Sequence, residues 1–204
     1  MSGLFDVFTN FDLNVFHWFE TAFNTGNYKI LDTVMYIITT LGDAGIIWIV
    51  LAVALMIPKK YRKCGMMMAG SLIIMLVLNN LVLKNLFQRP RPFLFFENSP
   101  VYQWWLNAGA QVESDRSFPS GHTTSSFAAV VPLFKRDKRF GAAALVLAIL
   151  IAFSRIYVHV HYCTDILFGV VLGVVYGLLG CLVIGLIIKL IESKKPKLAT
   201  KIFG

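Results

Sequence analysis

Five long apolar runs, separated by shorter polar segments, restrict what this chain can fold into more than any other feature of its sequence. The runs cover residues 44–57, 65–83, 120–134, 141–158 and 165–190. A helix needs about 20 mostly apolar residues to cross the hydrocarbon core of a bilayer, where every backbone hydrogen bond must be satisfied internally. We therefore predict an all-α integral membrane bundle of about five to six transmembrane helices. The sixth would come from the N-terminal part, if that part enters the membrane.

The composition agrees with a membrane protein and argues against nucleic acid as a partner. Of the 204 residues, 57% are hydrophobic and 15% are charged, whereas soluble domains carry about 25% charged residues. A net charge of +8 would suggest nucleic acid in a soluble protein. Here most basic residues lie between or after the apolar runs, where membrane topology places them. We expect the bilayer as a partner and no nucleic acid, and the sequence predicts no particular oligomeric state.

The connecting segments predict how the bundle is oriented. Lys and Arg concentrate in residues 58–63, 135–139 and 194–201, which fall on one side of a five-span bundle. An excess of Lys and Arg marks the cytoplasmic side. The opposite, extracytoplasmic side then receives the N-terminal segment, residues 85–118 and the turn near His161. We expect a multi-pass membrane protein with this orientation.

The chain divides into three predicted parts. Residues 1–29 mix aromatic with acidic and polar side chains, and predict an amphipathic helical segment that lies in the membrane interface. Residues 30–190 form the membrane-embedded domain. Residues 191–204 form a basic cytoplasmic tail.

Polar clusters stand at the ends of apolar runs, within residues 84–92, 117–122 and 154–165. Ionisable groups in such places are costly, and a functional role is the default interpretation. The predicted topology puts all three clusters at the outer membrane face, where they can converge on one site.

The basic residues of these clusters predict an anion site. Lys84, Arg91 and Arg155 supply positive charge, and arginine can hold phosphate oxygens with two hydrogen bonds. Ser120 and Gly121 begin an apolar run, where the free N–H groups of a helix N-terminus can bind phosphate. The alternative is that the basic residues only anchor helix ends in the interface.

Two histidines and an aspartate predict the chemistry. His161 and Asp165 are four residues apart, so they share a face if both lie on a helix. A carboxylate on one imidazole nitrogen fixes the tautomer and leaves the other nitrogen free to attack. His122, from another run, can protonate the leaving oxygen as a general acid. By spacing alone His159 is an alternative nucleophile, but the partner at i+4 selects His161, and we expect His159 to pack or to support the site.

A metal site is the less favoured interpretation of the same residues. His159, His161 and Asp165 could ligate a cation, but the neighbouring Arg and Lys residues would repel it. The cysteines Cys64 and Cys163, together with Cys181, show no metal-type spacing. We expect no metal and no cofactor.

Other polar and aromatic residues allow more than one interpretation. Arg89 and Arg116 could reach a second phosphate, but we favour solvated loop charges. Asp43, close to two glycines, is expected to break a helix at the interface. The aromatic side chains of the outer loop could form an interfacial belt or guide a lipid chain; they are Phe93, Phe95, Phe96, Tyr102, Trp104 and Trp105.

The three clusters resemble the signatures of the phosphatidic acid phosphatase type 2 and haloperoxidase superfamily, which read K-x6-RP, PSGH and SR-x5-H-x3-D. Every signature position is matched, in the same order, by Lys84, Arg91-Pro92, Pro119-Ser120-Gly121-His122, Ser154-Arg155, His161 and Asp165. The resemblance covers about residues 31–190.

The resemblance implies a mechanism without metal or cofactor. His161 would attack phosphorus and form a phosphohistidine, Asp165 would orient it, and His122 would protonate the leaving group. The phosphate oxygens would be bound by Lys84, Arg91, Ser120, Gly121 and Arg155.

The resemblance also implies a lipid phosphate or diphosphate as the substrate. Bacterial undecaprenyl-diphosphate phosphatases are the most similar branch, which implies hydrolysis of undecaprenyl diphosphate to undecaprenyl phosphate. The alternative within the family is a phosphatidylglycerophosphate or phosphatidic acid phosphatase. An anion or lipid transporter without hydrolysis is a less favoured hypothesis, because no half-repeat is visible.

Overall fold

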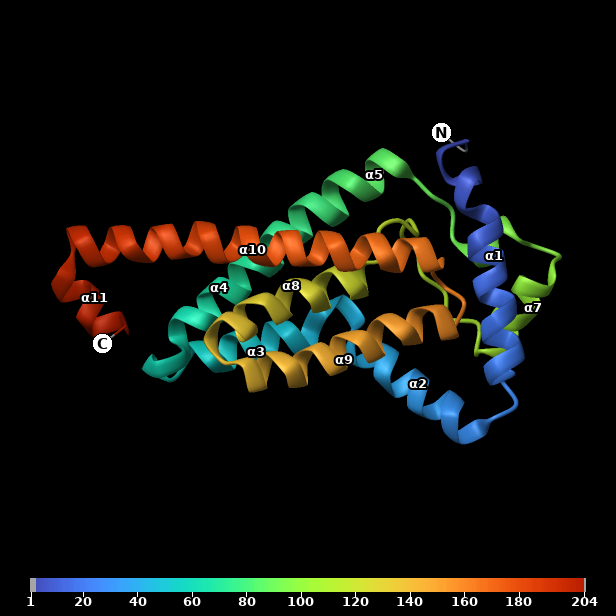
Figure 1. The fold of residues 1–204 in the computed structure, drawn as a ribbon, viewed down its shortest axis with the longest axis horizontal. Helices are drawn as coiled ribbons and strands as arrows, with labels where there is room; N and C mark the ends of the chain where they lie inside the picture. Colours follow the sequence, from blue (N-terminus) through green and yellow to red (C-terminus); the bar gives the residue numbers. More distant parts are fainter. Residues whose placement is uncertain (1–2, 204) are drawn as a thin grey trace.

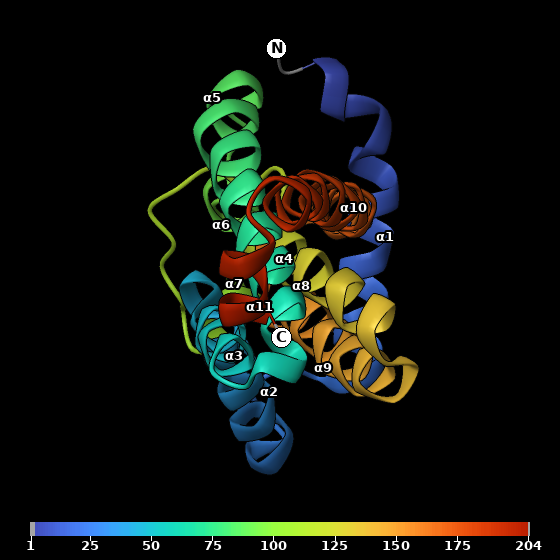
Figure 2. The ribbon, with the colours of Figure 1, turned by 90° about the vertical axis from the view of Figure 1, so that its left-hand side faces the viewer.

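The computed structural model describes residues 3–203, which contain helices and no strands (Figure 1). Five helices form a long bundle: α3 (Ile46–Met56), α4 (Lys59–Met75), α8 (Gly121–Arg136), α9 (Lys138–Tyr157) and α10 (Cys163–Lys194). Viewed along the bundle, α8 lies between α4, α9 and α10, the helices against which it packs most (Figure 2). The prediction of an all-α membrane bundle is confirmed.

Fewer helices have the length of a span than the sequence predicts. Three stretches are long and apolar enough to cross a membrane, Lys59–Phe95, Lys138–Tyr157 and Cys163–Lys194. A fourth forms if Lys29–Leu41 and Asp43–Met56, which are bent by 44°, count as one span. The predicted span at residues 120–134 is α8, a helix of only 16 residues. It is about 24 Å long, against a hydrocarbon core of about 30 Å, and neighbouring helices bury most of it.

Shorter elements occupy the two ends of the bundle. A break at Asp43–Gly45 bends α2 away from α3, with Gly45 in the left-handed region at φ 67°. A π-helical segment continues α4 towards the end of the bundle that holds α5. The remaining elements are α1 (Gly3–Phe23), α2 (Lys29–Leu41), the π-helical segment (Leu76–Leu83), α5 (Lys84–Phe87), α6 (Pro92–Phe95), α7 (Pro100–Asn107) and α11 (Pro196–Phe203).

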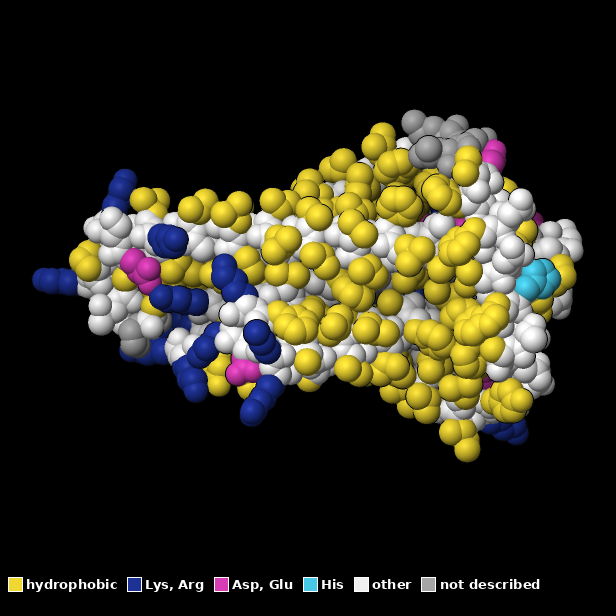
Figure 3. Space-filling view, viewed as in Figure 1, with side chains coloured by type: hydrophobic (Ala, Val, Ile, Leu, Met, Phe, Trp, Pro, Cys, Tyr) yellow, Lys and Arg dark blue, Asp and Glu magenta, His cyan; other side chains and the backbone are white. Residues whose placement is uncertain are grey.

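Charge separates the two ends. Lys and Arg side chains gather at the end that holds α11 and the α8–α9 turn, while apolar side chains cover the flanks of the bundle (Figure 3). At this end α11 folds back onto α4, where Arg62 donates a hydrogen bond of 2.6 Å to the carbonyl of Ile202. The three basic segments therefore share one end, as the predicted topology requires. That this end faces the cytoplasm stays a prediction.

The N-terminal helix α1 lies across the opposite end, roughly perpendicular to the bundle (Figure 1). Its Phe16 and Phe19 are buried against the bundle, whereas Trp18 is exposed. One polar residue on the inner face, Asp12, is completely buried. The helix has an inner and an outer face, and its position in the membrane interface stays a prediction.

Glycines allow α10 to approach α8 and α4 closely. A Cβ added at Gly173 would lie 2.7 Å from the Cβ of Phe127, and one at Gly180 would lie 2.5 Å from the backbone of Ser71. Small residues at such positions let helices in a membrane gain dispersion contacts over their backbones. The positions of Gly173 and Gly180 therefore determine where α10 contacts α8 and α4.

Replacing Gly180 with alanine is expected to destabilise the bundle by about 1–3 kcal/mol, because the added methyl group collides with backbone that cannot move independently. The measurement is the melting temperature of the purified protein in detergent. Gly185→Ala is the matched control, because its Cβ would meet only the flexible end of Met67 at 3.6 Å. Equal melting temperatures for the two variants would contradict this account of the packing.

Candidate active site

The three polar clusters of the sequence meet at the end of the bundle that lies beneath α1. One cavity of about 360 Å³ is lined by Lys84, Arg91, Gly121, His122 and His161, with residues of the segment 113–115 on another side. These residues come from α5, the segment before α6, the start of α8 and the turn before α10. Segments far apart in the sequence therefore supply one polar cavity at the end of apolar helices.

His161 and Asp165 are in contact, but the geometry differs from the sequence prediction. His161 lies in the turn that precedes α10, not on a helix, and its Nδ1 is 3.3 Å from Oδ2 of Asp165. Asp165 is the third residue of α10, and its Oδ2 also accepts a hydrogen bond of 3.2 Å from the backbone N–H of Tyr162. The sequence analysis expected these two residues to meet because they would share a helix face, and that reason was wrong. The contact exists because a capping aspartate reaches back over the turn.

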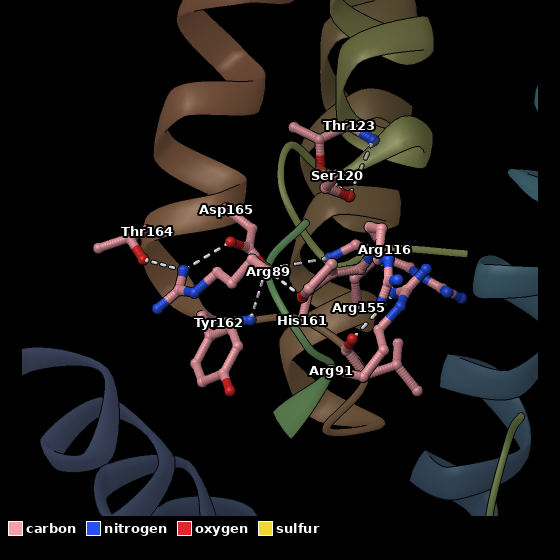
Figure 4. A network of polar contacts seen from close by, with 12 residues as sticks. Arg89, Arg91, Arg116, Ser120, Thr123, Arg155, His161, Tyr162, Thr164 and Asp165 are labelled. Atoms are coloured by element: carbon pink, nitrogen blue, oxygen red, sulfur yellow. Dashed lines mark hydrogen bonds and ion pairs between the residues drawn. The ribbon is translucent and has the colours of Figure 1, made fainter. Parts of the chain in front are cut away.

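The other ring nitrogen of His161 faces a cation. The Nη1 of Arg91 is 2.8 Å from Nε2 of His161. A guanidinium can only donate, so Nε2 must carry the lone pair and Nδ1 must carry the proton that Asp165 accepts. The lone pair of Nε2 therefore points towards Arg91, which lines the cavity together with His161 (Figure 4).

Burial of His161, together with the nearby charges of Arg91, Arg155 and Lys84, holds its pKa well below 6.5. The ring is therefore neutral at neutral pH. A neutral ring retains the lone pair that attack on phosphorus needs.

The start of α8 also lines the cavity, through Gly121 and His122. Ser120 is the N-cap, and its Oγ accepts hydrogen bonds from the backbone N–H and from the hydroxyl of Thr123. A Cβ on Gly121 would lie 3.8 Å from Nζ of Lys84. The N-terminus of the helix and the lysine ammonium therefore face the same space, which suits an anion.

Carboxylates of the outer loop pair with the cations, which the sequence analysis did not anticipate. Asp115 accepts hydrogen bonds from Lys84 and Arg91, and Glu113 accepts one from Arg155. Burial alone would raise the pKa of Asp115, but the adjacent Lys84 and Arg91 outweigh it and hold the pKa below its usual value. The sequence feature that could have indicated these two acids is their position, because both closely precede the PSGH motif.

Asp43 does more than break a helix. Its Oδ1 is 2.9 Å from Nε2 of His122, so the interpretation from sequence was incomplete. The break between α2 and α3 lies against the start of α8, and a Cβ on Gly42 would lie 2.7 Å from the His122 ring. A bend in one membrane segment thus delivers a carboxylate to the second histidine.

The interpretation of Arg89 as a solvated loop charge is wrong. The side chain is buried, donates to Asp12 at 2.8 Å and to Asp165 at 2.6 Å, and lies against the ring of Tyr162. Sequence could not separate it from Arg116, which is exposed as expected. The two arginines differ in which carboxylates the fold brings to them.

His159 packs away from the cavity, as expected. It is buried between Phe16 and Trp104, with its backbone at φ 55°. Burial lowers its pKa to about 4, so it is a neutral part of the core. Within residues 3–203, no three His, Cys, Asp or Glu side chains are arranged to hold a metal ion.

Comparison with known proteins adds the family. The model of the PAP2 superfamily matches residues 61–188. The undecaprenyl-diphosphatase BcrC of Bacillus subtilis (strain 168) is 30% identical over 151 residues, which are 74% of this chain and 74% of that protein.

Two crystal structures share the fold. LpxE of Aquifex aeolicus aligns with a TM-score of 0.68 and 25% identity, over 82% of this chain and 93% of that chain. A transmembrane PAP2 type phosphatidylglycerolphosphate phosphatase of Bacillus subtilis aligns with a TM-score of 0.63 and 26% identity, over 86% and 87%. With its family model matched over more than half of its length, this chain belongs to the PAP2 superfamily.

Proposed function

We propose that this protein is a membrane lipid phosphatase that hydrolyses undecaprenyl diphosphate to undecaprenyl phosphate through a phosphohistidine at His161. The family and the relatives support the general class, a lipid phosphatase in a membrane. The observation that carries the mechanism is the neutral imidazole of His161, held between Asp165 and Arg91 beside a cationic cavity.

In the proposed first step, oxygens of the terminal phosphoryl group replace Asp115 and Glu113 on Lys84, Arg91 and Arg155. Nε2 of His161 attacks phosphorus as the bond from phosphorus to the leaving oxygen breaks. A protonated His122 gives its proton to that oxygen. Fixed cations and the helix N-terminus stabilise the charge on the equatorial oxygens, which is the main requirement in phosphoryl transfer.

The second step restores the enzyme. His122, now neutral, takes a proton from a water molecule that attacks the phosphohistidine. The bond between nitrogen and phosphorus breaks, and inorganic phosphate leaves. Asp165 holds the proton of Nδ1 throughout, so that His161 returns to the same tautomer.

An apolar groove supports a lipid substrate. It has a volume of about 280 Å³, lies between α3 and α4, and shares Ala44, Gly45, Met75 and Leu76 with the polar cavity. A hydrocarbon chain in this groove would place its phosphate among the cations. The cavity lies opposite the basic end of the bundle, which supports an extracytoplasmic active site.

The second candidate is phosphatidylglycerophosphate, because one of the structures with this fold is a phosphatase named for that lipid. A panel of undecaprenyl diphosphate, phosphatidylglycerophosphate and phosphatidate in mixed micelles, with EDTA present, tests both. We expect the highest kcat/KM for the prenyl diphosphate and undiminished phosphate release in EDTA. A higher kcat/KM for phosphatidylglycerophosphate would select the second candidate, and no phosphate release from any lipid would overturn both.

Variants of the two histidines are expected to differ in their dependence on the leaving group. His161→Ala should abolish phosphate release from every substrate, because the nucleophile is lost. His122→Ala should slow the first step, release of the leaving group, about 10²- to 10⁴-fold with a lipid substrate, but much less with p-nitrophenyl phosphate, whose leaving group needs no proton. The measurement is the pre-steady-state burst of leaving group for both variants on both substrates. Full turnover by His161→Ala, or the same slowing of the first step by His122→Ala on both substrates, would refute the roles assigned.

Asp115→Asn is expected to lower KM without lowering kcat. The substituted side chain no longer competes as an anion for Lys84 and Arg91. Because the carboxylate is half exposed, KM should fall by at most about fivefold, equivalent to about 1 kcal/mol. The checks are KM and the inhibition constant of inorganic phosphate, with Glu97→Gln in the same outer segment as the control. A rise in both constants would show instead that Asp115 helps to bind the substrate.

A further inference from the structure

A continuous chain of buried charges connects the N-terminal helix to the proposed nucleophile, and Figure 4 shows its part from Arg89 to Asp165. Asp12 of α1 accepts a hydrogen bond of 2.8 Å from Nη2 of Arg89, and Nη1 of the same guanidinium donates at 2.6 Å to Oδ1 of Asp165. Oδ2 of Asp165 is the atom that contacts Nδ1 of His161. We infer that Arg89 and Asp12 are positioning residues for His161, which extends the proposed function and rests on it.

Asp165 needs a cation because it is completely buried. An unpaired buried carboxylate is so costly that it becomes protonated or draws in a counter-charge. Among the lysines and arginines of residues 3–203, Arg89 is the one that forms an ion pair with Asp165. Arg89 therefore favours the ionised form of Asp165 and occupies Oδ1, while Oδ2 accepts a hydrogen bond from the Ser117 hydroxyl and contacts the imidazole.

Asp12 in turn holds Arg89. Its side chain is completely buried and accepts hydrogen bonds from the backbone N–H of Thr164 at 2.9 Å and from the Thr164 hydroxyl at 2.8 Å. Cζ of Arg89 lies 3.6 Å from the ring centroid of Tyr162 and 4.4 Å from that of Phe5. Two carboxylates and two aromatic rings thus hold the orientation of the guanidinium.

The sum of the charges suits the reaction. Asp12, Arg89 and Asp165 together carry one net negative charge, next to an imidazole that is neutral before attack. When Nε2 bonds to phosphorus, the ring becomes positive. A fixed negative charge beyond Nδ1 stabilises that positive charge in the transition state without having to reorganise.

A purely structural clamp is the competing explanation, because the same ion pairs attach α1 to the bundle. The two explanations differ in kinetics. A clamp that only holds α1 in place changes the stability of the protein and acts independently of Asp165. A positioning chain changes kcat, and its effect disappears once Asp165 has lost its charge.

The test compares Arg89→Gln, Arg89→Lys and Asp12→Asn with the unmodified protein, using phosphate release from undecaprenyl diphosphate and from phosphatidate in micelles. Asp6→Asn is the matched control, because Asp6 lies on the same helix and is exposed. We expect kcat to fall about 100-fold for Arg89→Gln and about 10-fold for Asp12→Asn, with KM changed less than about threefold. Arg89→Lys should recover part of the loss, and Asp6→Asn should leave kcat unchanged.

The decisive measurement is a double-mutant cycle with Asp165→Asn. In that background Arg89→Gln should cause no further loss of kcat, because the residue through which it acts is already disabled. Equal losses of kcat in both backgrounds, or a folded Asp12→Asn variant with normal kcat, would overturn the inference. If Arg89→Gln does not fold, the isosteric Asp12→Asn variant gives the same cycle. An unmodified protein that releases no phosphate from either lipid would instead refute the proposed function.

Discussion

The pairing of buried charges at one end of an apolar bundle determines most of what this molecule can do. Lys84, Arg89, Arg91 and Arg155 are each at most 5% exposed, and each has a carboxylate within ion-pair distance. Charges in such a place are tolerated only when they are paired and hydrogen-bonded. The segments that carry these residues therefore bring groups of both signs to the same end.

The pairs are of two kinds, and the difference follows from exposure. Arg89 is paired with Asp12 and Asp165, both completely buried, so neither carboxylate can leave without a large cost. Arg91 and Lys84 are paired with Asp115, whose side chain is half exposed and can return to water. The same physical requirement thus yields a permanent ion-pair chain behind His161, the proposed nucleophile, and replaceable ion pairs in front of it. A phosphate group needs the second kind.

Sequence predicted what local patterns determine and missed what only tertiary contacts determine. The helical class, the shared basic end and the approach of His161 to Asp165 all follow from runs, loop charges and spacing within a few residues. The partners of Arg89 and His122 do not, because Asp12 and Asp43 are 77 and 79 residues away from them. Nothing local in the sequence distinguishes Arg89 from Arg116. The length of α8 was not predictable for a related reason, because the neighbours that surround this short helix accommodate it.

The two histidines have different neighbours, as the roles proposed for them require. Arg91 donates to the ring of His161, which favours its neutral form, whereas the carboxylate of Asp43 lies at the ring of His122 and offsets part of the cost that burial imposes on its charged form. A nucleophile needs the first state and a proton donor needs the second. The residues that create this difference, Arg91 and Asp43, come from the ends of different helices. In the proposed mechanism the break between α2 and α3 therefore matters to the chemistry, because it holds Asp43 at 2.9 Å from His122.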